Sequence, residues 1–428
     1  EFDRNACSIK SGGKSRRAAR MTEMRQSHPD IMGFIRGKPD EDHKALTLIQ
    51  NGWSEGMDGD AYGTVAYQNT NLSIQLDDHF FDQLKINGKI QQRRVVDGKV
   101  VGEVEADRML KEIAFGSWRI GDPAVQYEGE IQRMHTSKNS GRINSTNPCS
   151  EYAFLDDTSC NLASLNLLAF SDLKGNFDIQ RFTKASRLIA IAQDIANDAA
   201  GYPIDDIATI SPEFRTIGLG YANLGALLMR RGVAYDSLEG RAFAGAVTAL
   251  MTGTAYEASA EMAEGLGTFV HYEFNKRHMA EVIDTHKARL SGIQWEHVSG
   301  DLKSAVEKSW NNAVRLGKKN GYRNAQTTLL APTGTTSSLM GCDSTGVEPI
   351  ISHVIYKDLA GGGVLTLLNK ETENALSNLG YTSGEIGDIS RYIAEEVAPK
   401  ITRGTVQGAP HMRPEHYSIF DTAFGNKF

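Results

Sequence analysis

The sequence has few cysteines, and their spacing is typical of neither a disulfide scaffold nor a zinc site. The cysteines are Cys7, Cys149, Cys160 and Cys342, and the chain contains no CxxC and no HExxH motif. Nothing therefore indicates a metal site. Because disulfides are rare in reducing compartments, this usage fits the cytoplasm, where a cysteine pair is more often catalytic than structural.

Long apolar runs and an excess of positive charge are also absent. The chain has no run of about eighteen apolar residues and no apolar signal core, so we expect no membrane contact. Its 428 residues have a net charge of −7, which provides no global positive field for nucleic acid or anionic lipid. No repeat, low-complexity tract or Pro/Ser-rich linker marks a domain boundary.

The stretch with the clearest chemical content is Asn147-Pro148-Cys149-Ser150-Glu151. Pro148 has no N–H and biases Asn147 away from helix, which predicts an extended run. In an extended chain alternate side chains share one face, so Asn147, Cys149 and Glu151 should converge. An amide, a thiol and a carboxylate would then form a reaction centre. The alternative is a buried, inert Cys149 followed by a surface Glu151.

Apolar periodicity and turn residues predict several elements around this stretch. Residues 72–76 alternate as in a half-buried strand, and 95–101 indicate a hairpin with an Asp-Gly turn. A helix should begin after Asp178 and end at Gly201 and Pro203. Its expected apolar face comprises Phe182, Ala185, Leu188, Ala192, Ile195 and Ala199. A second helix, poor in charge, is predicted over residues 239–264, where it should be packed on several sides.

Two further segments have a composition suited to phosphate. Residues 325–331 predict a strand that leads into the hydroxyl-rich residues 332–338 and the start of a helix. Free N–H groups and hydroxyls at such a turn can cradle a phosphate, but a ligand-free capping cluster is equally compatible. Near the N-terminus, Gly12 and Gly13 precede four cations, Lys14, Arg16, Arg17 and Arg20. This segment could approach a phosphate closely, or it could be a solvated turn.

Taken in order, the motifs of this chain resemble the catalytic subunit of ribonucleotide reductases, most closely the adenosylcobalamin-dependent class II enzymes. The similarity covers almost all 428 residues. It includes Gly12-Gly13, Arg16-Arg17-Ala18, His28-Pro29-Asp30-Ile31, Gly121-Asp122-Pro123, Asn139-Ser140-Gly141-Arg142-Ile143-Asn144, Asn147-Pro148-Cys149-Ser150-Glu151, Gly218-Leu219-Gly220-Tyr221-Ala222-Asn223-Leu224-Gly225, Arg323-Asn324-Ala325-Gln326, Ala331-Pro332-Thr333-Gly334-Thr335 and Gly408-Ala409-Pro410.

The resemblance implies an α/β fold, a ten-stranded barrel with a central finger loop. It implies that residues 1–428 are a partial catalytic barrel domain, incomplete at both ends. The family's N-terminal strands, with the partner cysteine of Cys160, would lie before Glu1, and its last strands and redox tail after Phe428. We therefore expect an internal fragment that is insoluble or partly disordered, and inactive, without those segments.

The resemblance also implies a role for each motif residue. Cys149 would form the thiyl radical that abstracts the ribose 3′-hydrogen, Glu151 would take the 3′-hydroxyl proton, and Asn147 would bind the sugar hydroxyls. Cys160 would belong to the redox pair that becomes a disulfide. The substrate-binding residues would be Pro148, Ser150, Pro332, Thr333, Gly334, Thr335 and Thr336. The specificity loop between substrate and effector would contain Lys10, Gly12, Gly13, Lys14, Arg16 and Arg17.

Finer features favour class II, hence adenosylcobalamin as cofactor. Glu151 argues against the glycyl-radical class, and Cys160 follows Cys149 by only eleven residues. Buried surroundings should keep Cys149 a thiol, as hydrogen-atom chemistry requires. The expected partners are a ribonucleotide, dNTP or ATP effectors, a thioredoxin-like dithiol reductant and a second copy in a homodimer. The alternatives are a class I large subunit with a separate metal-containing radical subunit, or a non-catalytic nucleotide-binding protein.

Overall fold

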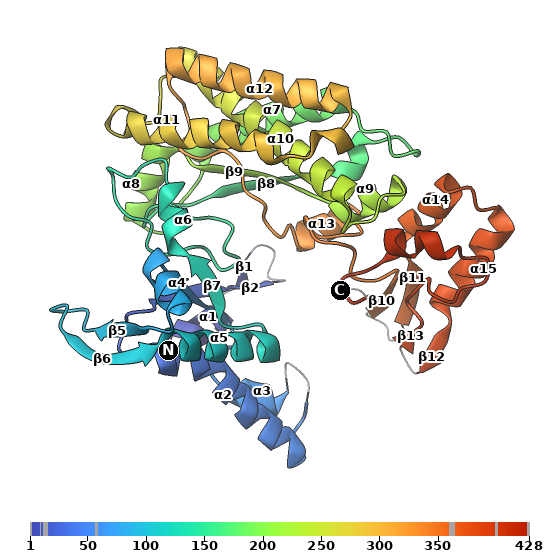
Figure 1. Cartoon of the computed structure of the whole chain (residues 1–428), viewed down its shortest axis with the longest axis horizontal. Coiled ribbons are helices and arrows are strands. Elements are labelled where there is room, and N and C mark those ends of the chain that lie inside the picture. The colour runs from blue at the N-terminus through green and yellow to red at the C-terminus, as the bar shows by residue number, and fades with distance from the viewer. Residues whose placement is uncertain are drawn as a thin grey trace. The chain divides into compact units, whose positions relative to one another are not determined.

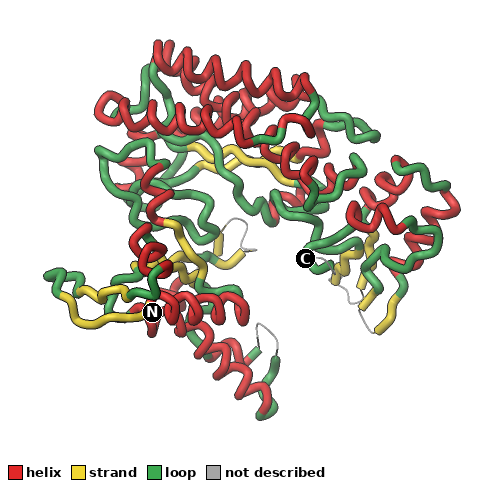
Figure 2. The backbone as a smooth tube through the Cα atoms, viewed as in Figure 1, coloured by secondary structure: helices red, strands yellow, loops and turns green. Residues whose placement is uncertain are grey.

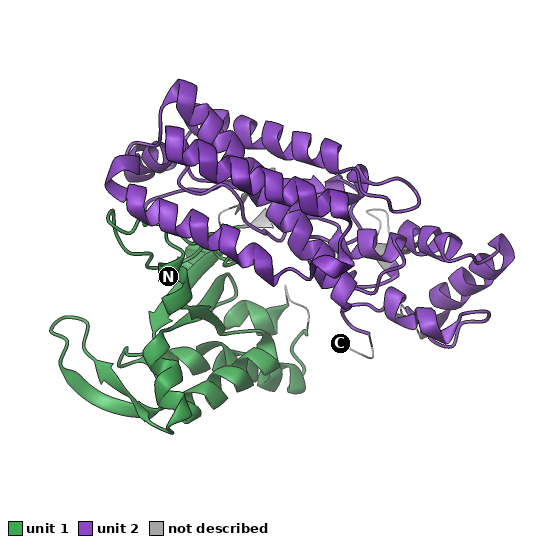
Figure 3. Ribbon diagram, turned by 45° about the horizontal axis from the view of Figure 1, so that its top comes forward, with its two compact units in different colours: residues 1–156 green, residues 157–428 purple. Residues whose placement is uncertain are grey.

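The computed structural model describes residues 2–8, 10–11, 16–55, 59–358, 364–398 and 401–425. The chain divides into two compact units, residues 1–156 (unit 1) and residues 157–428 (unit 2; Figure 3). Helices and strands occur in both units (Figure 2), which confirms the expected mixed α/β content. Within the described residues the sheets have two or three strands, and none closes into a barrel.

Unit 1 is built on a parallel sheet of three strands, β3 (Arg20–Arg25), β4 (Thr70–Leu76) and β7 (Ala124–Tyr127). The strand β4 lies in the centre. The other elements of this unit are α1 (Phe2–Ser8), β1 (Lys10–Ser11), β2 (Arg16–Arg17), α2 (Ile31–Gln50), α3 (Asp60–Thr64), α4 (Asp78–Lys85), β5 (Lys89–Arg93), β6 (Val100–Glu105), α5 (Ala106–Ile120) and α6 (Glu128–Arg133).

The strand predicted at residues 72–76 is β4, but it is buried on both faces rather than one. Ile74 and Leu76 pack against Ile31 and Ile35 of α2 in the core of unit 1. On the opposite face, Ser73 and Gln75 are buried as well. The half-buried prediction was wrong because β4 is the central strand, and a central strand of a parallel sheet is covered on both sides.

The predicted hairpin is confirmed as β5 and β6, which pair antiparallel. Gly98 has a φ of 69°, a left-handed conformation that glycine adopts without strain. The turn is longer than predicted, because Val95 and Val96 lie in it and are 80% and 98% exposed. They were expected to lie in the strands.

Unit 2 contains two parallel strands, β8 (Asn161–Asn166) and β9 (Ile217–Ala222). Residues 326–329 run beside β9, and the N–H of Leu219 donates to the carbonyl oxygen of Thr327 over 3.0 Å. The strand predicted at 325–331 is therefore extended, but it forms only an isolated bridge between Leu219 and Thr328. Close approach requires glycine at position 220, where a Cβ would lie 2.6 Å from the carbonyl oxygen of Leu329.

Three long helices pack together over these strands: α7 (Ile179–Ala199), α10 (Leu238–Leu266) and α12 (Gly300–Asn320; Figure 1). The helix α7 begins as predicted, since Asp178 accepts a bond from the N–H of Arg181 over 2.9 Å. The helix predicted at 239–264 is α10, buried along most of its length as expected. The indole of Trp310 on α12 donates to the carbonyl oxygen of Ala249 on α10 over 2.9 Å.

The apolar face predicted for α7 is wrong beyond its first turn. Leu188 and Ile195 are 54% and 63% exposed, whereas Gln193 and Asp194 are buried. The reason is pairing, because Asp194 binds the guanidinium of Arg215 (Nε–Oδ1, 2.9 Å). A buried polar group with a partner can replace apolar contacts on one face of a helix.

The remaining elements of unit 2 complete the helical layer and a smaller C-terminal part in which β10 pairs with β11, and β12 with β13. They are η1 (Leu167–Phe170), α8 (Asp205–Phe214), α9 (Leu224–Arg230), α11 (Tyr272–Arg289), η2 (Leu290–Gly292), η3 (Trp295–His297), α13 (Thr335–Leu339), β10 (Val354–Asp358), β11 (Val364–Leu368), α14 (Lys370–Asn378), α15 (Ser383–Ala394), β12 (Glu396–Ala398), β13 (Ile401–Thr402) and η4 (Pro414–Phe420). Among the described residues, no helix has the length and apolarity needed to cross a membrane.

Candidate active site

Residues 147–150 form a β-turn instead of the extended run that the sequence predicts. The N–H of Ser150 donates to the carbonyl oxygen of Asn147 over 2.9 Å. Proline is favoured at the second position of such a turn because its φ is already near the required value. The prediction was wrong because Pro148 suits both conformations, and contacts outside the pentapeptide select the turn.

Two pairs of residues close the loop that contains this turn. Thr146 and Ala153 form an antiparallel bridge. Inside it, the N–H of Asn147 donates to the carbonyl oxygen of Tyr152 over 3.2 Å. The loop is therefore a small hairpin with Cys149 near its tip. We refer to residues 147–152 as the cysteine turn.

The cysteine turn brings the side chains of Asn147 and Glu151 together. The amide Nδ2 of Asn147 donates to Oε2 of Glu151 over 2.6 Å, and its Oδ1 accepts from the N–H of Tyr152 over 2.9 Å. Both ends of the amide are thus occupied, which fixes its orientation. Cys149 lies between these residues in sequence and is exposed. The expectation that its thiol is buried was wrong, because it lies near the tip of a hairpin.

The base of the cysteine turn is bound to the unit 1 sheet by Glu23 of β3. Its Oε1 accepts two hydrogen bonds from Thr146, one from the N–H and one from the hydroxyl, each 2.8 Å long. The other oxygen accepts from Nε2 of Gln75 on β4 over 2.7 Å. A carboxylate with three donors is firmly oriented, so it fixes where the turn begins.

The tip of the cysteine turn is bound by the two other strands. Asn71 of β4 donates to the carbonyl oxygen of Pro148, and Gln126 of β7 donates to the hydroxyl of Ser150 over 2.8 Å. Sequence reasoning missed these anchoring residues. A signal was present in β4, whose polar residues alternate with apolar ones in a strand that a parallel sheet buries. Polar side chains in such a strand usually have partners, and the partner of the half-buried Asn71 is the turn.

In unit 2, Cys160 is half-buried and directly precedes β8. On one side, the N–H of Ser159 donates to the hydroxyl of Ser211 over 2.9 Å. On the other, Asn161 and Gln193 exchange two bonds, in which each side-chain amide donates to the other's carbonyl oxygen over 2.8 and 2.6 Å. The backbone on both sides of the thiol is therefore fixed.

Gly218 of β9 provides the space in which the thiol of Cys160 lies. A Cβ at position 218 would be 2.7 Å from Sγ of Cys160. It would also lie 2.6 Å from Leu329 and 2.8 Å from Leu162, in each case from Cδ2. No heavy atom fits at these distances, so any side chain at this position must displace the thiol or the leucines.

Residues 332–338, which we call the hydroxyl turn, follow the extended segment beside β9. Thr333 binds on two sides: its N–H donates to Thr345 O over 2.8 Å, and its hydroxyl to the hydroxyl of Ser164 on β8 over 2.9 Å. Gly334 has a φ of 59° and directly precedes α13. The predicted succession of extended chain, turn and helix is thus confirmed in outline. Because α13 has five residues, its dipole can contribute little.

Two ionisable groups a few residues after the hydroxyl turn have shifted pKa values. Burial, with a smaller effect of the neighbouring carboxylate, raises the pKa of Cys342 to about 11. Burial also raises the pKa of Asp343 to about 6; Glu371 adds to this shift, and Arg230 and Lys370 oppose it. At neutral pH Cys342 is therefore a thiol, as expected for a cysteine that packs rather than reacts.

The predicted site residues fall in both units. The cysteine turn belongs to unit 1, whereas Cys160 and the hydroxyl turn belong to unit 2. In the predicted specificity loop, Lys10 of β1 pairs with Arg17 of β2, and Arg16 with Ser11. Gly12, Gly13 and Lys14 lie outside the described residues.

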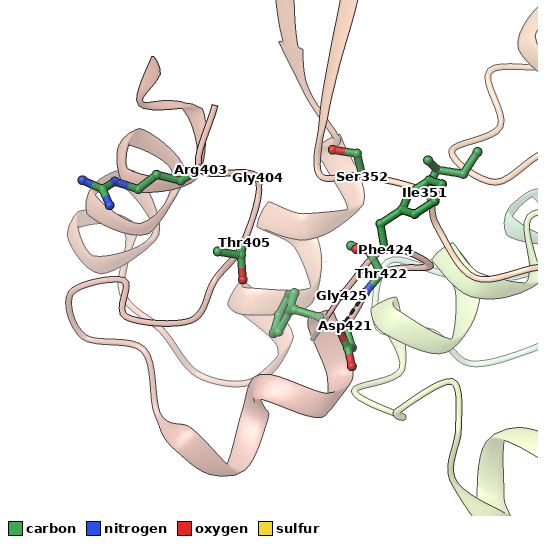
Figure 4. A pocket seen from close by; sticks show the side chains of 10 residues that line it. Ile351, Ser352, Arg403, Gly404, Thr405, Asp421, Thr422, Phe424 and Gly425 are labelled. Carbon is green, nitrogen blue, oxygen red and sulfur yellow. Dashed lines mark hydrogen bonds between the residues drawn. The ribbon is translucent and has the colours of Figure 1, made fainter. Parts of the chain in front are cut away.

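A cavity of about 330 Å³ lies elsewhere in unit 2 (Figure 4). It is lined by Ile351, Ser352, Arg403, Gly404, Thr405, Phe420, Asp421, Thr422, Phe424 and Gly425. Its one cation, Arg403, is already paired with Glu395 (Nε–Oε2, 2.8 Å). None of the predicted site residues lines this cavity, so its size alone does not make it the active site.

The family described as "Ribonucleotide reductase, barrel domain" matches residues 1–427 of this chain. A vitamin B12-dependent ribonucleotide reductase of Rhodopirellula baltica is 43% identical over 99% of the chain and 40% of its own length. One of Streptomyces coelicolor is 42% identical over 99% of the chain and 44% of its own length. A vitamin B12-dependent ribonucleoside-diphosphate reductase of Thermoplasma acidophilum is 28% identical over 92% and 43%, respectively. The chain thus spans less than half the length of these curated relatives.

Proposed function

Because the chain belongs to the ribonucleotide reductase barrel-domain family, we propose that it forms part of a catalytic subunit that reduces ribonucleotides to 2′-deoxyribonucleotides. The observation that supports this most directly is the cysteine turn. There an exposed thiol, Cys149, lies in sequence between Asn147 and Glu151, whose amide and carboxylate are hydrogen-bonded over 2.6 Å. A module that only binds nucleotides needs no thiol at such a place.

In the proposed chemistry, residues of the cysteine turn act in successive steps. Cys149, as a thiyl radical, takes the hydrogen atom from the 3′ carbon of the ribose. Oε2 of Glu151 accepts a bond from Asn147, and its Oε1 receives the 3′-hydroxyl proton. A thiol pair that includes Cys160 supplies two electrons and two protons and becomes a disulfide: one proton leaves with the 2′-hydroxyl as water, and the other ends as the new hydrogen on C2′. Cys149 then returns its hydrogen atom to C3′, which regenerates the thiyl radical, and Glu151 returns the proton to the 3′-oxygen. The external dithiol then reduces this disulfide.

Substrate binding is proposed for residues of both units. Pro148 and Ser150 would contact the sugar from the cysteine turn. Residues 332–336 would bind the phosphates through hydroxyls and backbone N–H groups. Because α13 has only five residues, its dipole adds little, and the proposed binding depends on the hydroxyls and N–H groups. For the specificity loop we propose Lys10, Gly12, Gly13, Lys14, Arg16 and Arg17, between the substrate base and a dNTP or ATP effector.

The proposed radical source is adenosylcobalamin, as the names of the relatives support. When bound, this cofactor supplies an unpaired electron that can be passed to a thiol by transfer of a hydrogen atom. Because Cys149 is exposed, its thiol is accessible to a separate radical source. We assign no residue of this chain as its ligand. A metal-containing radical subunit, as in class I, is the alternative that the experiment below distinguishes.

For the complete enzyme we further propose the ten-stranded barrel with the cysteine turn as its finger loop. We also propose a homodimer, a thioredoxin-like reductant and a cytoplasmic location, where the thiols remain reduced. These proposals concern a complete enzyme and not this chain alone, because the curated relatives are more than twice as long as the chain.

The test is deoxynucleotide formation by the complete enzyme that contains this chain, assayed without oxygen. Diphosphate and triphosphate substrates are each supplied with dithiol and adenosylcobalamin, or with a metal-loaded radical subunit. We expect turnover with the cobalamin only, and none for a Cys149→Ser variant. Turnover only with the metal subunit would move the enzyme to class I, and no turnover with either source would contradict the proposed function.

A further inference from the structure

Asn223 lies at the end of β9 in a conformation that few residues tolerate. Its φ is 74° and its ψ 27°, in the left-handed region that favours glycine and, among other residues, asparagine. It is fully buried, yet its side chain does not cap the helix α9 that begins at the next residue. A buried amide must have partners, and those of Asn223 lie in another part of unit 2.

Both ends of the Asn223 amide are hydrogen-bonded. Its Oδ1 accepts from the backbone N–H groups of Asp343 and Ser344, over 2.9 and 3.1 Å. Its Nδ2 donates to Oδ1 of Asn166 over 3.1 Å. Because two donors face one atom of the amide and an acceptor faces the other, the orientation of the group is fixed by the network.

Asn166 extends this network from the end of the neighbouring strand β8. Its Oδ1 also accepts from the N–H of Leu168 over 3.1 Å, and its Nδ2 donates to the carbonyl oxygen of Met340 over 3.3 Å. The Asn166–Asn223 pair thus binds residues 340–344, which directly follow α13, to the carboxyl ends of β8 and β9.

The other end of the hydroxyl turn is bound to the same strands. Thr333 donates to Ser164 of β8 and to the backbone of Thr345, as described above. The N–H of Asn223 donates to Gly346 O over 3.0 Å. The hydroxyl turn is therefore fixed on both sides, through Thr333 near its start and through the Asn166–Asn223 pair, which binds the residues after it.

We propose that Asn166 and Asn223 are positioning residues for the hydroxyl turn, and that they determine how tightly the enzyme binds the phosphates of its nucleotide substrate. The inference rests on the proposed function of residues 332–336. Neither asparagine is assigned a contact with substrate. The chemistry at this position requires an acceptor for two N–H groups, a donor for Asn166 and tolerance of a positive φ, and asparagine meets all three requirements.

Two substitutions at position 223 separate these requirements in the complete enzyme. Asn223→Gly retains the backbone conformation and removes the amide. Asn223→Asp keeps the shape and the acceptor, but it places an oxygen against Oδ1 of Asn166. The matched control is Asn87→Gly, at an exposed asparagine that also has a positive φ, 51°, in unit 1.

We expect both Asn223 variants to raise the KM for the nucleotide roughly tenfold, the effect of about one lost hydrogen bond, with kcat changed less than about threefold. The inhibition constant of inorganic pyrophosphate should rise in parallel, while that of the unphosphorylated nucleoside stays constant. The Asn87→Gly control should change none of these. A general loss of folding would lower kcat and would not separate the phosphate from the nucleoside.

Several results would overturn the inference. One is an unchanged KM and pyrophosphate inhibition constant in both variants; another is an equal loss for the nucleoside. If Asn223→Gly does not fold, the isosteric Asn223→Asp decides. A Thr335→Ala variant distinguishes failure of the proposed phosphate site from failure of the positioning role of Asn223. If it raises the KM and the Asn223 variants do not, the inference fails while the phosphate site stands. If unmodified enzyme forms no deoxynucleotide, the proposed function itself fails; if it does so but pyrophosphate does not inhibit it, the phosphate site proposed at residues 332–336 fails, and the inference with it.

Discussion

The thiol of Cys160 lies in the space that a side chain at Gly218 would fill, with Sγ only 2.7 Å from the position of the missing Cβ. Gly218 lies in β9, and Cys160 directly precedes β8. Hydrogen bonds of Ser159 and Asn161 fix the backbone on both sides of Cys160. The thiol thus has little freedom to move away from an added methyl group without changing its rotamer.

We therefore predict that Gly218→Ala displaces the thiol more than it harms the fold. The atoms that crowd position 218 are ends of side chains, which can shift, so the free energy of unfolding should fall by about 1–3 kcal/mol. Turnover of the complete enzyme should fall at least about tenfold, and the rate of Cys160 alkylation should change with it. The control is Gly265→Ala, where an added Cβ meets nothing within 4 Å. A Gly218→Ala enzyme with normal turnover and normal alkylation would contradict the prediction.

The two cysteines should fail in different ways when replaced. Cys149→Ser should abolish turnover, because an O–H bond is too strong to exchange hydrogen with the sugar. Cys160→Ser should permit the first hydrogen abstraction but not clean reduction, so base should be released from the nucleotide. Product analysis by chromatography distinguishes these outcomes. Normal multiple turnover by either variant would rule out its assigned role.

The carboxylate of Glu151 is predicted to act as a base rather than as a structural partner of Asn147. Glu151→Gln keeps the size of the side chain and an oxygen that can accept from Asn147, but it cannot take a proton. We expect kcat to fall by about 10²–10⁴ with little change in thermal stability. Glu103→Gln, at an exposed residue of β6, is the control. A change in stability with unchanged kcat would show that Glu151 serves the turn alone.

Local signals in the sequence predicted those parts of the fold that depend on neighbouring residues. The cap at Asp178, the Asp97-Gly98 turn and the buried helix α10 all follow from a few residues each. The face of α7 could not be predicted in this way. Its burial is decided by Arg215, which lies outside the helix and pairs with Asp194.

The same limit applies to the candidate site. The pentapeptide indicated that Asn147 and Glu151 meet, but not that a closed turn brings them together. That turn is selected by Glu23, Asn71 and Gln126, which come from three different strands. A single sequence does not show which distant polar residues share a site, because their partners are fixed only when the sheet forms.

The raised pKa of Asp343 predicts a specific dependence of stability on pH. Its ordinary value is 3.8 and its folded value about 6, so between these the folded state binds more protons than the unfolded state. This contribution to stability is therefore present at low pH and is lost as the pH rises from about 4 to about 6. Asp343→Asn should remove this pH dependence, which changes the free energy of unfolding by up to about 3 kcal/mol. Chemical unfolding of both proteins at pH 4.5 to 7 measures the difference between their free energies of unfolding. The Asp343→Asn variant should become more stable relative to the unmodified protein as the pH rises, and a constant difference would contradict the prediction.

The last prediction concerns Arg215, whose side chain is 6% exposed. Its guanidinium binds Asp194 over 2.9 Å and Asp198 over 2.5 and 2.9 Å. Asn324, at the start of the segment that leads to the hydroxyl turn, donates to Asp194 over 2.8 Å and to the carbonyl oxygen of Arg215 over 2.9 Å. This network therefore connects α7 and α8 to the chain beside β9.

Arg215→Met should lower the free energy of unfolding by about 3–5 kcal/mol, because it leaves the carboxylate of Asp194 buried without its main partner. Methionine has a Cβ like arginine, so the cost of the positive φ at this position, 53°, is unchanged. The control is Arg277→Met, which removes an exposed ion pair with Glu281 and should cost less than about 0.5 kcal/mol.

The pH dependence of the same variant provides a second measurement. The hydrogen bond from Arg215 lowers the pKa of Asp198, against a smaller opposing effect of burial. A carboxyl whose folded pKa is depressed stabilises the fold above its unfolded pKa, and this stability is lost as the pH falls through the folded value. Unmodified protein should therefore lose more stability than Arg215→Met when the pH is lowered below about 4. Equal losses of stability in the two proteins would show that the exposed Asp198 contributes nothing through Arg215. If Arg215→Met lowers the free energy of unfolding no more than Arg277→Met does, the network does not stabilise this unit.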